Sequence, residues 1–341
     1  MCQKEGYPGS VGIRIFPVSH CFAINVPVLH GLACIEMKRF LSVFLTILFL
    51  SAIIGLSPYD IEAAAYPFSF PPETVDGEKP MPVIGFIDSH LVEEGQTLLQ
   101  IARIYGLGYN QMALYHPEID PWLPEAGMVI DIPSKWIPPP TRHRAVVVNI
   151  PEMRLYRFFE EHHMVRTYPI GIGREGFNTP VMETRVVAKI ENPSWTVPPS
   201  AWEKYGRKVM PPGPENPLGD YWIGLAANNI GIHGTNFPWG VGRRVSHGCI
   251  RLYPEHAAQF YHEVDRGMIV EILYEPVKVG VRGDLVFLEA HPDIYELFPD
   301  LETHAWTVIN GAGVADIVDP LKVRQCIDAR KGVPTLISRD P

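Results

Sequence analysis

Proline recurs throughout this chain, with 34 prolines among 341 residues. That share is about twice the usual proline content of a protein. A proline ring inside a helix removes a hydrogen bond and clashes with the preceding turn, and within a sheet proline is confined to edges and bulges. The chain is therefore expected to form short strands, loops and linkers, and no long helices.

The length of the chain exceeds what one ordinary compact core supports, so we expect two domains or more. About 46% of the residues are apolar, which is typical of a globular protein. The formal net charge of −9 argues against nucleic acid as a partner, because its phosphates require a basic face.

The N-terminal region has the pattern of an export signal. Residues 1–36 show no periodicity and are expected to be a mis-assigned start or a disordered extension. Basic residues after Met37, an apolar run over residues 40–56 and three alanines ending at Ala65 then follow the order of a signal peptide, which we place at 37–65. The alternative is a membrane anchor, for which the apolar run is short. Residues 66–87 are expected to be a linker.

Residues 88–134 are expected to form a small β-α-α-β module. Thr97 is placed to cap a helix whose apolar residues recur at helical spacing and which ends at Gly106. A second short helix ends before Pro117, and a strand closes the module. A proline-rich linker, 135–142, follows it.

Residues 143–275 read as a mainly β domain. Apolar, β-rich runs on both sides of Pro151-Glu152 predict a hairpin, and Tyr221–Leu225 is a further strand. Proline-laden loops lie between the later strands, and their Trp195, together with Trp222 on the strand, is expected either to line a cleft or to pack in the core. Pro254 begins a short helix. Residues 276–341 are expected to be an extension that packs on this domain.

Two segments of that domain, Ile232–Asn236 and Ser246–Arg251, hold a thiol, two imidazoles, a guanidinium and several glycines. A working cysteine, here Cys249, needs a nearby base or positive charge, and histidine is the usual base. Gly248 carries no side chain beside that thiol, so backbone N–H groups can hold a developing oxyanion. Arg251 offers a planar fork of donors to a carboxylate.

Two other interpretations of these residues stand beside the catalytic one. A lone cysteine or histidine is commonly a buried structural residue. Cys249, His247 and His233 would also suit zinc, but no CxxC pair or HExxH accompanies them. Because the residues arrive together, a nucleophilic site is favoured, and no metal or cofactor is expected.

The runs HGTN and SHGCIR resemble the signature of the L,D-transpeptidases, the YkuD-like enzymes of bacterial cell walls. The resemblance extends over about residues 143–290. It implies that Cys249 is the nucleophile and that His233 accepts and donates its proton. It also implies oxyanion or orienting roles for His247, Gly248, Gly234 and Ser246, and substrate contacts for Arg251, Trp195 and Asn236.

The module at 88–134 resembles a LysM module, a family that binds glycans containing N-acetylglucosamine. Its EEGQTL, IARIYG, HPEIDP and GMVIDIP segments carry the resemblance, with His116 where the family often has Asn. The expected fold is thus multidomain: a β-sandwich-like catalytic domain of mixed sheets with a short helix after the cysteine, plus a small βααβ LysM module.

The resemblance implies a peptidoglycan stem peptide as substrate. A thioester would form on Cys249 as the terminal D-Ala leaves, and an amine would then take the acyl group, giving a 3-3 crosslink or attaching a lipoprotein. Water as acceptor would make the enzyme a carboxypeptidase or endopeptidase. The expected partners are therefore stem peptides and glycan strands, with a wall-anchored lipoprotein as one option, in the periplasm or cell envelope.

Two interpretations from other classes remain. In NlpC-like wall endopeptidases the cysteine precedes its histidine, whereas His233 precedes Cys249 here. A non-catalytic glycan-binding wall protein would have no use for a nucleophile and a base.

Cys326 is expected to stay outside any permanent disulfide, with a redox pair as the alternative. His256 and His262 are expected at the surface.

Overall fold

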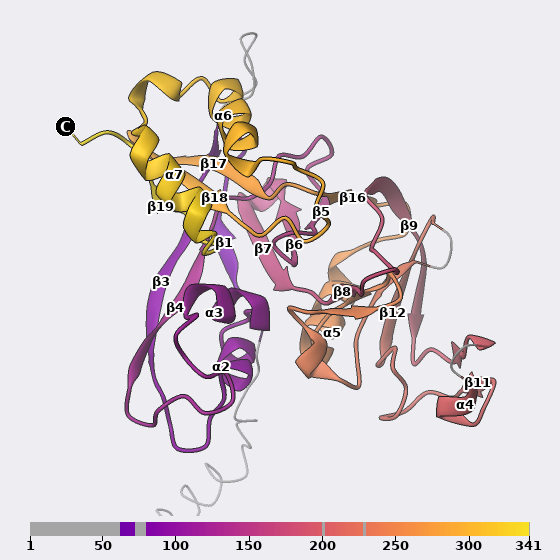
Figure 1. Ribbon diagram of the computed structural model, residues 1–341. Helices are drawn as coiled ribbons and strands as arrows, with labels where there is room; N and C mark the ends of the chain where they lie inside the picture. The colour runs from indigo at the N-terminus through magenta and orange to yellow at the C-terminus, as the bar shows by residue number, and fades with distance from the viewer. Residues whose placement is uncertain (1–61, 72–79, 200–201, 228–229, 341) are drawn as a thin grey trace, which may run out of the picture. The chain divides into compact units, whose positions relative to one another are not determined.

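The computed structural model describes residues 62–71, 80–199, 202–227 and 230–340 (Figure 1). The chain divides into two compact units, Met1–Pro58 and Tyr59–Pro341, and every described residue belongs to the second. The extension expected at 1–36 and residues 37–61 of the expected signal peptide lie outside the described residues. Among the described residues, no helix has both the length and the apolar character needed to cross a bilayer.

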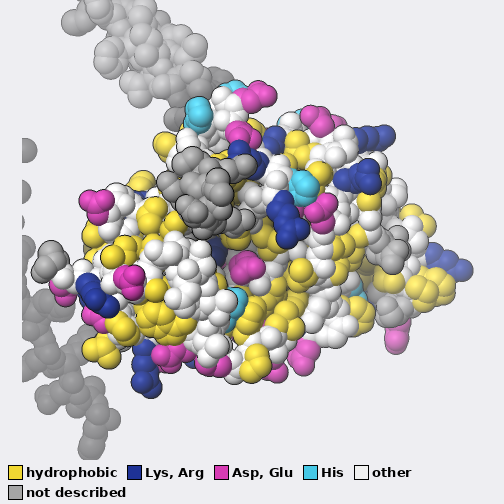
Figure 2. All heavy atoms as spheres, turned by 90° about the horizontal axis from the view of Figure 1, so that it is seen from above, with side chains coloured by type: hydrophobic (Ala, Val, Ile, Leu, Met, Phe, Trp, Pro, Cys, Tyr) yellow, Lys and Arg dark blue, Asp and Glu magenta, His cyan; other side chains and the backbone are white. Residues whose placement is uncertain are grey.

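Charged side chains of both signs are interspersed on the face seen in Figure 2. Lysine and arginine do not gather there into one continuous patch.

A nine-stranded mixed sheet forms the centre of the described chain, in the order β1-β7-β6-β5-β16-β9-β12-β13-β15. Its strands are β1 (Ala65–Pro67), β5 (Val146–Asn149), β6 (Arg154–Phe159), β7 (Met164–Pro169), β9 (Met182–Glu191), β12 (Tyr221–Leu225), β13 (Gly231–His233), β15 (Ile250–Arg251) and β16 (Ile269–Leu273). The pairs β5–β16 and β13–β15 are parallel and the others antiparallel. The expected mainly β chain with mixed sheets and few helices is confirmed, as is the hairpin at Pro151-Glu152.

Short elements complete this region. They are β8 (Ile172–Gly173), β10 (Trp195–Thr196), β11 (Val209–Met210), β14 (Arg244–Ser246), the helices α4 (Trp202–Tyr205) and α5 (Pro254–Glu263), and the 3-10 turns Glu160–His162 and Pro238–Gly240. β10 pairs with β11, and β14 pairs with β8.

A β-α-α-β unit precedes the sheet in the chain. It consists of β3 (Ile84–Leu91), α2 (Leu98–Ile104), α3 (Tyr109–Tyr115) and β4 (Val129–Trp136), with the two strands in one antiparallel pair. Thr97 caps α2, because its side chain accepts the Gln100 backbone N–H while the Gln100 side chain accepts the Thr97 N–H. The helix boundary expected from sequence is therefore confirmed.

Residues 136–139 of the segment expected as a linker at 135–142 are buried in the protein. β4 continues through Trp136, which is 1% exposed. The Ile137 backbone N–H donates to Glu289 Oε2 at 2.6 Å. Sequence alone gave no sign of this acceptor, because it lies far along the chain.

The C-terminal residues build their own layer on a small sheet. It contains β17 (Val277–Arg282), β18 (Leu285–Ala290), β19 (Thr335–Leu336) and β2 (Met81–Pro82), with α6 (Leu301–Gly311), α7 (Pro320–Ala329) and the 3-10 turn Ala315–Ile317. Asp300 and Asp319 cap α6 and α7. Figure 1 shows both helices, in yellow, beside β17 and β18.

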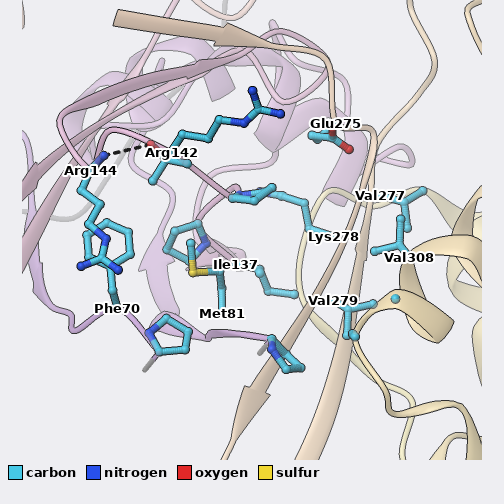
Figure 3. Close-up of a pocket in the computed structure, with 17 residues that line it drawn as sticks. Phe70, Met81, Ile137, Arg142, Arg144, Glu275, Val277, Lys278, Val279 and Val308 are labelled. Atoms are coloured by element: carbon cyan, nitrogen blue, oxygen red, sulfur yellow. Dashed lines mark hydrogen bonds between the residues drawn. The ribbon is translucent and has the colours of Figure 1, made fainter. Parts of the chain in front are cut away.

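A cavity of about 670 Å³ lies where β17 meets the segment 137–144 and the residues Phe70, Pro71, Pro80 and Met81 (Figure 3). Ile137, Met81 and Val279 line its apolar part, and Arg142 and Glu275 are among its charged residues. No residue of the thiol motif lines it.

Residues around the expected signal-peptide cleavage site take part in the fold. Ala63 is 3% exposed and its N–H donates to Gln259 Oε1 at 2.9 Å. Ala65 pairs with Arg166 at the edge of the nine-stranded sheet. Cleavage after Ala65 would remove these contacts, so N-terminal sequencing of the exported protein tests that boundary directly.

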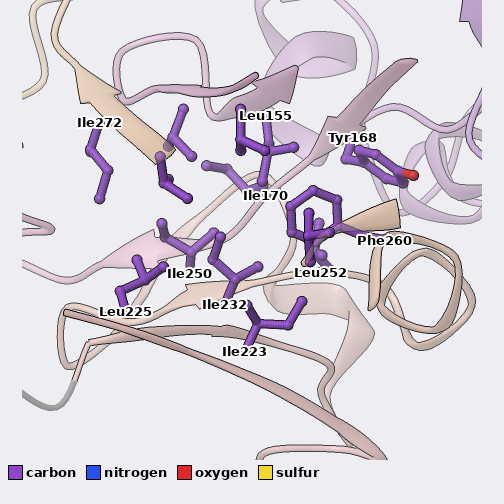
Figure 4. Close-up of a cluster of buried hydrophobic side chains, with 14 of the residues drawn as sticks. Leu155, Tyr168, Ile170, Ile223, Leu225, Ile232, Ile250, Leu252, Phe260 and Ile272 are labelled. Atoms are coloured by element: carbon purple, nitrogen blue, oxygen red, sulfur yellow. The ribbon is translucent and has the colours of Figure 1, made fainter. Parts of the chain in front are cut away.

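The core of the nine-stranded sheet lies between the sheet and α5 (Figure 4). Ile223, Ile232 and Ile250 are partners across β12, β13 and β15, and none is more than 1% exposed. Each such side chain contributes roughly 1.5–3 kcal/mol through burial. Because side chains alternate along a strand, this row leaves its neighbours facing the opposite side of the sheet.

α5 begins at Pro254 as expected, but His256, expected at the surface, is fully buried. The rings of Tyr168 and Tyr253 pack edge-on against it, with centroids 5.6 and 5.4 Å away. Burial lowers the pKa of His256 to about 4, so the ring is neutral. His262 is exposed, as expected.

Candidate active site

The thiol motif lies at the end of the nine-stranded sheet, where β12, β13 and β15 run side by side. Trp222 is the partner of His233 across β12 and β13, and His233 is the partner of Arg251 across β13 and β15. We call these three residues the motif row. It is the sheet position next to the buried isoleucine row, so its side chains face away from that core.

Cys249 precedes Arg251 by two positions, beside the position of Gly231 in the neighbouring strand. Gly231 leaves room for the indole of Trp222, because a methyl group there would lie 2.5 Å from Trp222 Cζ2. The same indole passes near Gly224, where a methyl group would lie 3.1 Å from Trp222 Nε1. The glycines thus let one flat ring cover the sheet beside the motif.

The turn from Ser246 to Cys249 is held by side-chain hydrogen bonds. Ser246 Oγ donates to the Cys249 carbonyl at 2.5 Å and accepts the Gly248 N–H at 3.1 Å. Gly248 has φ of +104°, a conformation that favours glycine. Thr179 Oγ1 donates to the Gly248 carbonyl at 3.0 Å and accepts the Gly173 N–H at 3.0 Å, which ties the turn to β8.

The imidazole of His233 is 3% exposed, and its Nδ1 donates to the Gly234 carbonyl at 2.6 Å. That bond keeps the proton on Nδ1 and leaves Nε2 as the basic nitrogen. Burial and the nearby Arg251 lower the pKa of His233 to about 3, against the opposing effect of the Gly234 and Leu218 backbone. The ring is therefore neutral at physiological pH.

The thiol of Cys249 is partly exposed. Burial raises its pKa above the usual value, while the Gly231 backbone and Arg251 act in the opposite direction. Burial likewise lowers the pKa of Arg251. The resting pair is thus a neutral thiol and a neutral imidazole, beside a guanidinium whose Nε has no hydrogen-bond acceptor among the described residues.

The other predicted site residues lie in different surroundings. His247 is exposed, with Nε2 3.1 Å from Arg174 Nη2 and its ring edge-on to Phe177. Asn236 is exposed and its Nδ2 donates to the Glu215 carbonyl at 2.9 Å. Trp195 is half-buried and packs edge-on against Tyr205.

Glu152, Glu289 and His291 form one group with metal-ligand spacing among the described residues, with ligand atoms within 4.8 Å of one another. Lys278 Nζ lies 2.8 Å from Glu152 Oε2 and 2.9 Å from Glu289 Oε1, in the place a cation would take. His291 Nε2 lies 2.7 Å from Glu289 Oε1. We call these four residues the Lys278 cluster, and treat it as a charge network.

Sequence reasoning missed two contributors to the site, Leu218 and Thr179, and left Trp222 undecided between a cleft and the core. Trp222 stacks on His233, with ring centroids 5.5 Å apart and planes at 25°. Leu218 reaches the imidazole through its backbone, and Thr179 holds the Gly248 carbonyl. The Thr179-Pro180 pair was visible in the sequence, but its contact with the motif depends on the pairing of distant strands.

Comparisons with known proteins identify the family to which the chain is similar. The YkuD family model, described as an L,D-transpeptidase catalytic domain, matches residues 143–272. The protein named probable L,D-transpeptidase YcfS of Escherichia coli (strain K12) is 33% identical over 75% of this chain and 85% of its own length. The one named probable L,D-transpeptidase YbiS of the same strain is 33% identical over 72% of this chain and 86% of its own length.

A solved structure titled as the Ldtfm-avibactam carbamoyl enzyme covers 40% of this chain and 50% of its own. Its sequence identity is 20% and its TM-score 0.32.

Proposed function

The chain belongs to the L,D-transpeptidase family, and from that premise we propose how its residues carry out acyl transfer on peptidoglycan. The observation that carries the proposal is the register of β13 and β15, which makes His233 and Arg251 neighbours beside the Cys249 turn. A thiol and a neutral imidazole with a basic Nε2 are the nucleophile and the base that a cysteine acyl transfer requires.

The first half-reaction forms a thioester. His233 Nε2 takes the thiol proton as Cys249 Sγ attacks the carbonyl between the L-centre of a diamino acid and the terminal D-Ala. The tetrahedral intermediate then collapses, the C–N bond breaks, and D-Ala leaves with that proton on its amine. A neutral pair suits this order, because the proton moves only as the sulfur attacks.

Main-chain donors in the motif stabilise the oxyanion in this proposal. Ser246 Oγ already accepts the Gly248 N–H, which supports a turn-holding role for Ser246. The oxyanion is therefore assigned to the main chain of His247 and Cys249. Arg251 is assigned to a carboxylate of the substrate, because its planar fork fits that group.

The second half-reaction returns the thiol. An acceptor amine attacks the thioester carbonyl, His233 takes a proton from the amine, and Cys249 Sγ leaves and recovers that proton. We propose an amine of a second stem peptide, which gives a 3-3 crosslink, or an amine of a wall-anchored lipoprotein. Water in place of the amine would give a carboxypeptidase or endopeptidase product.

We further propose that the β-α-α-β unit is a LysM module that binds glycan strands. Its order of elements supports this, and Trp122 and Leu123 before β4 are 56% and 80% exposed. Exposed aromatic and apolar side chains are typical of surfaces that bind other molecules. Cosedimentation with purified glycan strands, compared between the wild type and Trp122→Ala, tests this assignment.

The proposed site of action is the periplasm or cell envelope, where peptidoglycan lies. The run of basic, apolar and small residues over 37–65 supports export. Exclusion of the wild-type protein from the envelope fraction of a cell lysate would contradict it.

The chemistry is tested by labelling the protein with a thiol-reactive carbapenem and locating the adduct by mass spectrometry. We expect one adduct on Cys249 and none in Cys249→Ala. Cys326→Ala is the matched control: that thiol is buried, and burial raises its pKa to about 11. Its variant should label like the wild type. The absence of an adduct on Cys249 would contradict the proposed function.

Products distinguish the acceptors. Defined muropeptides incubated with the wild type should yield released D-Ala together with a crosslinked dimer, read by mass. D-Ala release without any dimer would favour water as acceptor.

A further inference from the structure

The two helices of the β-α-α-β unit contact the chain on both sides of the thiol motif. The contacts come from Arg103 near the end of α2, from the turn Gly106–Gly108 between α2 and α3, and from the first residue of α3. On the motif side they involve residues 241–243, which precede Cys249, and residues 253–256, which follow it. A tethered binding module would not need contacts of this kind.

The contact that precedes the motif is a close approach of two backbones. A methyl group on Gly242 would lie 2.3 Å from the Tyr109 backbone nitrogen, and one on Gly108 would lie 3.0 Å from Gly242 Cα. The Tyr109 N–H donates to the Val241 carbonyl at 3.4 Å. The Arg243 guanidinium lies 4.0 Å from the centroid of the Tyr109 ring.

The contact that follows the motif is polar and partly buried. Tyr253 OH donates to the Leu107 carbonyl at 3.0 Å. Arg103 donates twice to Glu255, with both distances 2.8 Å. The buried ring of His256 lies under Gly106, where a methyl group would meet His256 Cε1 at 3.8 Å.

The loop held by Gly108 lies directly against Arg251. Gly242 N–H donates to the Ile170 carbonyl at 2.9 Å, and Gly171 exchanges two 2.8 Å hydrogen bonds with Arg251. A methyl group on Gly240 would lie 3.8 Å from Arg251 Nη1. Displacing the loop at residue 242 would therefore displace the surroundings of the guanidinium.

We propose that the turn Gly106–Gly108 is a positioning element for the thiol motif, which fixes residues 241–243 and 253–256 and thereby holds Arg251 beside His233. The unit is then part of the catalytic scaffold as well as a binding module. This inference rests on the proposed roles of Cys249, His233 and Arg251.

The test compares two glycines with the same backbone strain. Gly242 and Gly127 have φ of +78° and +86°, but a methyl group on Gly127 meets nothing within 4 Å. Alanine disfavours the left-handed backbone conformation at both positions. Only at Gly242 does its methyl group also force the two backbones apart. Asparagine, which tolerates that conformation better, repeats the comparison with less strain.

The readout is the limiting rate of carbapenem acylation at Cys249, with stability measured by denaturant unfolding. Gly242→Ala should lower the rate by about ten- to a hundredfold, because small misplacements near a reacting group have effects of that size. Gly127→Ala should lose only the stability that the left-handed conformation costs, and it should keep the wild-type rate. Equal rates in the two variants would overturn the proposal.

A second comparison asks whether the effect passes through Arg251. In an Arg251→Gln background, Gly242→Ala should cost no more rate than Gly127→Ala, because the group being positioned is gone. A full additional loss in that background would overturn the proposal. Failure of the wild type to label at all would instead refute the proposed function.

Tyr253→Phe provides a milder variant in case Gly242→Ala does not fold. It removes only the hydroxyl that donates to Leu107, and we expect a rate loss of a few fold, on the order of one hydrogen bond. Tyr115→Phe is its control, since Tyr115 OH donates to Asp131 within the unit itself. The same rate in both tyrosine variants would contradict positioning from this side.

Discussion

The motif row and the Lys278 cluster both bury ionisable side chains. The two regions differ in how many hydrogen-bond and ion-pair partners those side chains have. In the cluster, Lys278 contacts two carboxylates, and Glu152 also accepts from Asn149 and Tyr156. In the motif row, the imidazole of His233 bonds only to the backbone, at Gly234 and Leu218, and Arg251 Nε has no acceptor among the described residues.

This difference distinguishes a structural charge network from a reactive site. Buried charges that are fully partnered stay charged and fix a packing arrangement. When a buried ionisable group has few partners, its pKa shifts so that the neutral form is favoured. Such a group also keeps unused hydrogen-bonding capacity for a substrate. The Lys278 cluster therefore joins β5–β6 to the C-terminal layer, whereas the side chains of the motif row remain available to contact a substrate.

Replacing the base is expected to give the largest effect on the motif side of this comparison. His233→Gln keeps a polar side chain but offers no nitrogen that takes a proton. The acylation rate at Cys249 should fall by about 10²–10⁴-fold, measured by stopped-flow or mass spectrometry. Stability should change by only about 1 kcal/mol, because one hydrogen bond to Gly234 is lost.

A His233→Gln variant that acylates within a few fold of the wild type would show that another base serves the thiol. His247→Gln is the matched control, since that exposed ring lies in the same motif and has no proton-transfer role in the proposal. Its rate should stay near the wild-type value.

Replacing the central cation of the Lys278 cluster should produce the opposite pattern. Lys278→Met leaves Glu152 and Glu289 buried without the ammonium group that contacts both of them. We expect a loss of about 3–5 kcal/mol in the free energy of unfolding, measured by urea titration. The folded fraction should still acylate at the wild-type rate.

Lys322→Met is the control for that loss. Lys322 pairs with the exposed Asp340, so its replacement should cost at most about 1 kcal/mol. Equal stability losses for the two lysine variants would mean that the Lys278 cluster is not a structural network. A loss of acylation in folded Lys278→Met would break the division between the two regions.

The pH dependence of acylation tests the neutral pair. The pKa of His233 is about 3 and that of Cys249 is raised, so neither group changes its charge between about pH 5 and 8. The wild-type rate should be nearly flat across that window. A bell-shaped profile within it would indicate a resting thiolate and imidazolium instead.

Arg251→Gln should move that profile in a defined direction. Arg251 lowers the pKa of His233, so its removal raises that pKa toward the usual value. Protonation of the imidazole then begins at higher pH, and the rate falls on the acid side by up to about tenfold per pH unit. Arg174→Gln, which acts on the exposed His247, should leave the profile flat.

Local signals in the sequence predicted local structure well. The cap at Thr97, the hairpin at Pro151-Glu152 and the helix start at Pro254 each depend on residues within a few positions. The thiol motif was visible for the same reason, because its members lie in two short runs. The comparisons confirm the family that those runs indicated.

Features that depend on distant partners were not visible. The segment 135–142 looked like a spacer because Glu289, which accepts from Ile137, lies far along the chain. His256 looked like a surface residue because nothing near it in sequence shows that Gly106 and Tyr168 would cover it. Trp222 was ambiguous for the same reason, since only the register of β12 and β13 places it on His233.

Trp222 offers the smallest and finest test of the comparison. Its indole stacks on His233 and covers Gly231, and burial is the largest cause of the low pKa of His233. Trp222→Phe keeps an aromatic ring but shortens its reach over Gly231. We expect the acylation rate to fall by roughly two- to tenfold, in line with an aromatic contact of about 0.5–1.5 kcal/mol. Water that reaches the imidazole would also raise its pKa, so the loss should be larger at pH 5 than at pH 8. Trp306→Phe, a partly buried tryptophan in the C-terminal layer, should change stability alone. If Trp222→Phe also lost only stability, this ring would belong with the structural network, and the reactive side of the sheet would reduce to His233, Cys249 and Arg251.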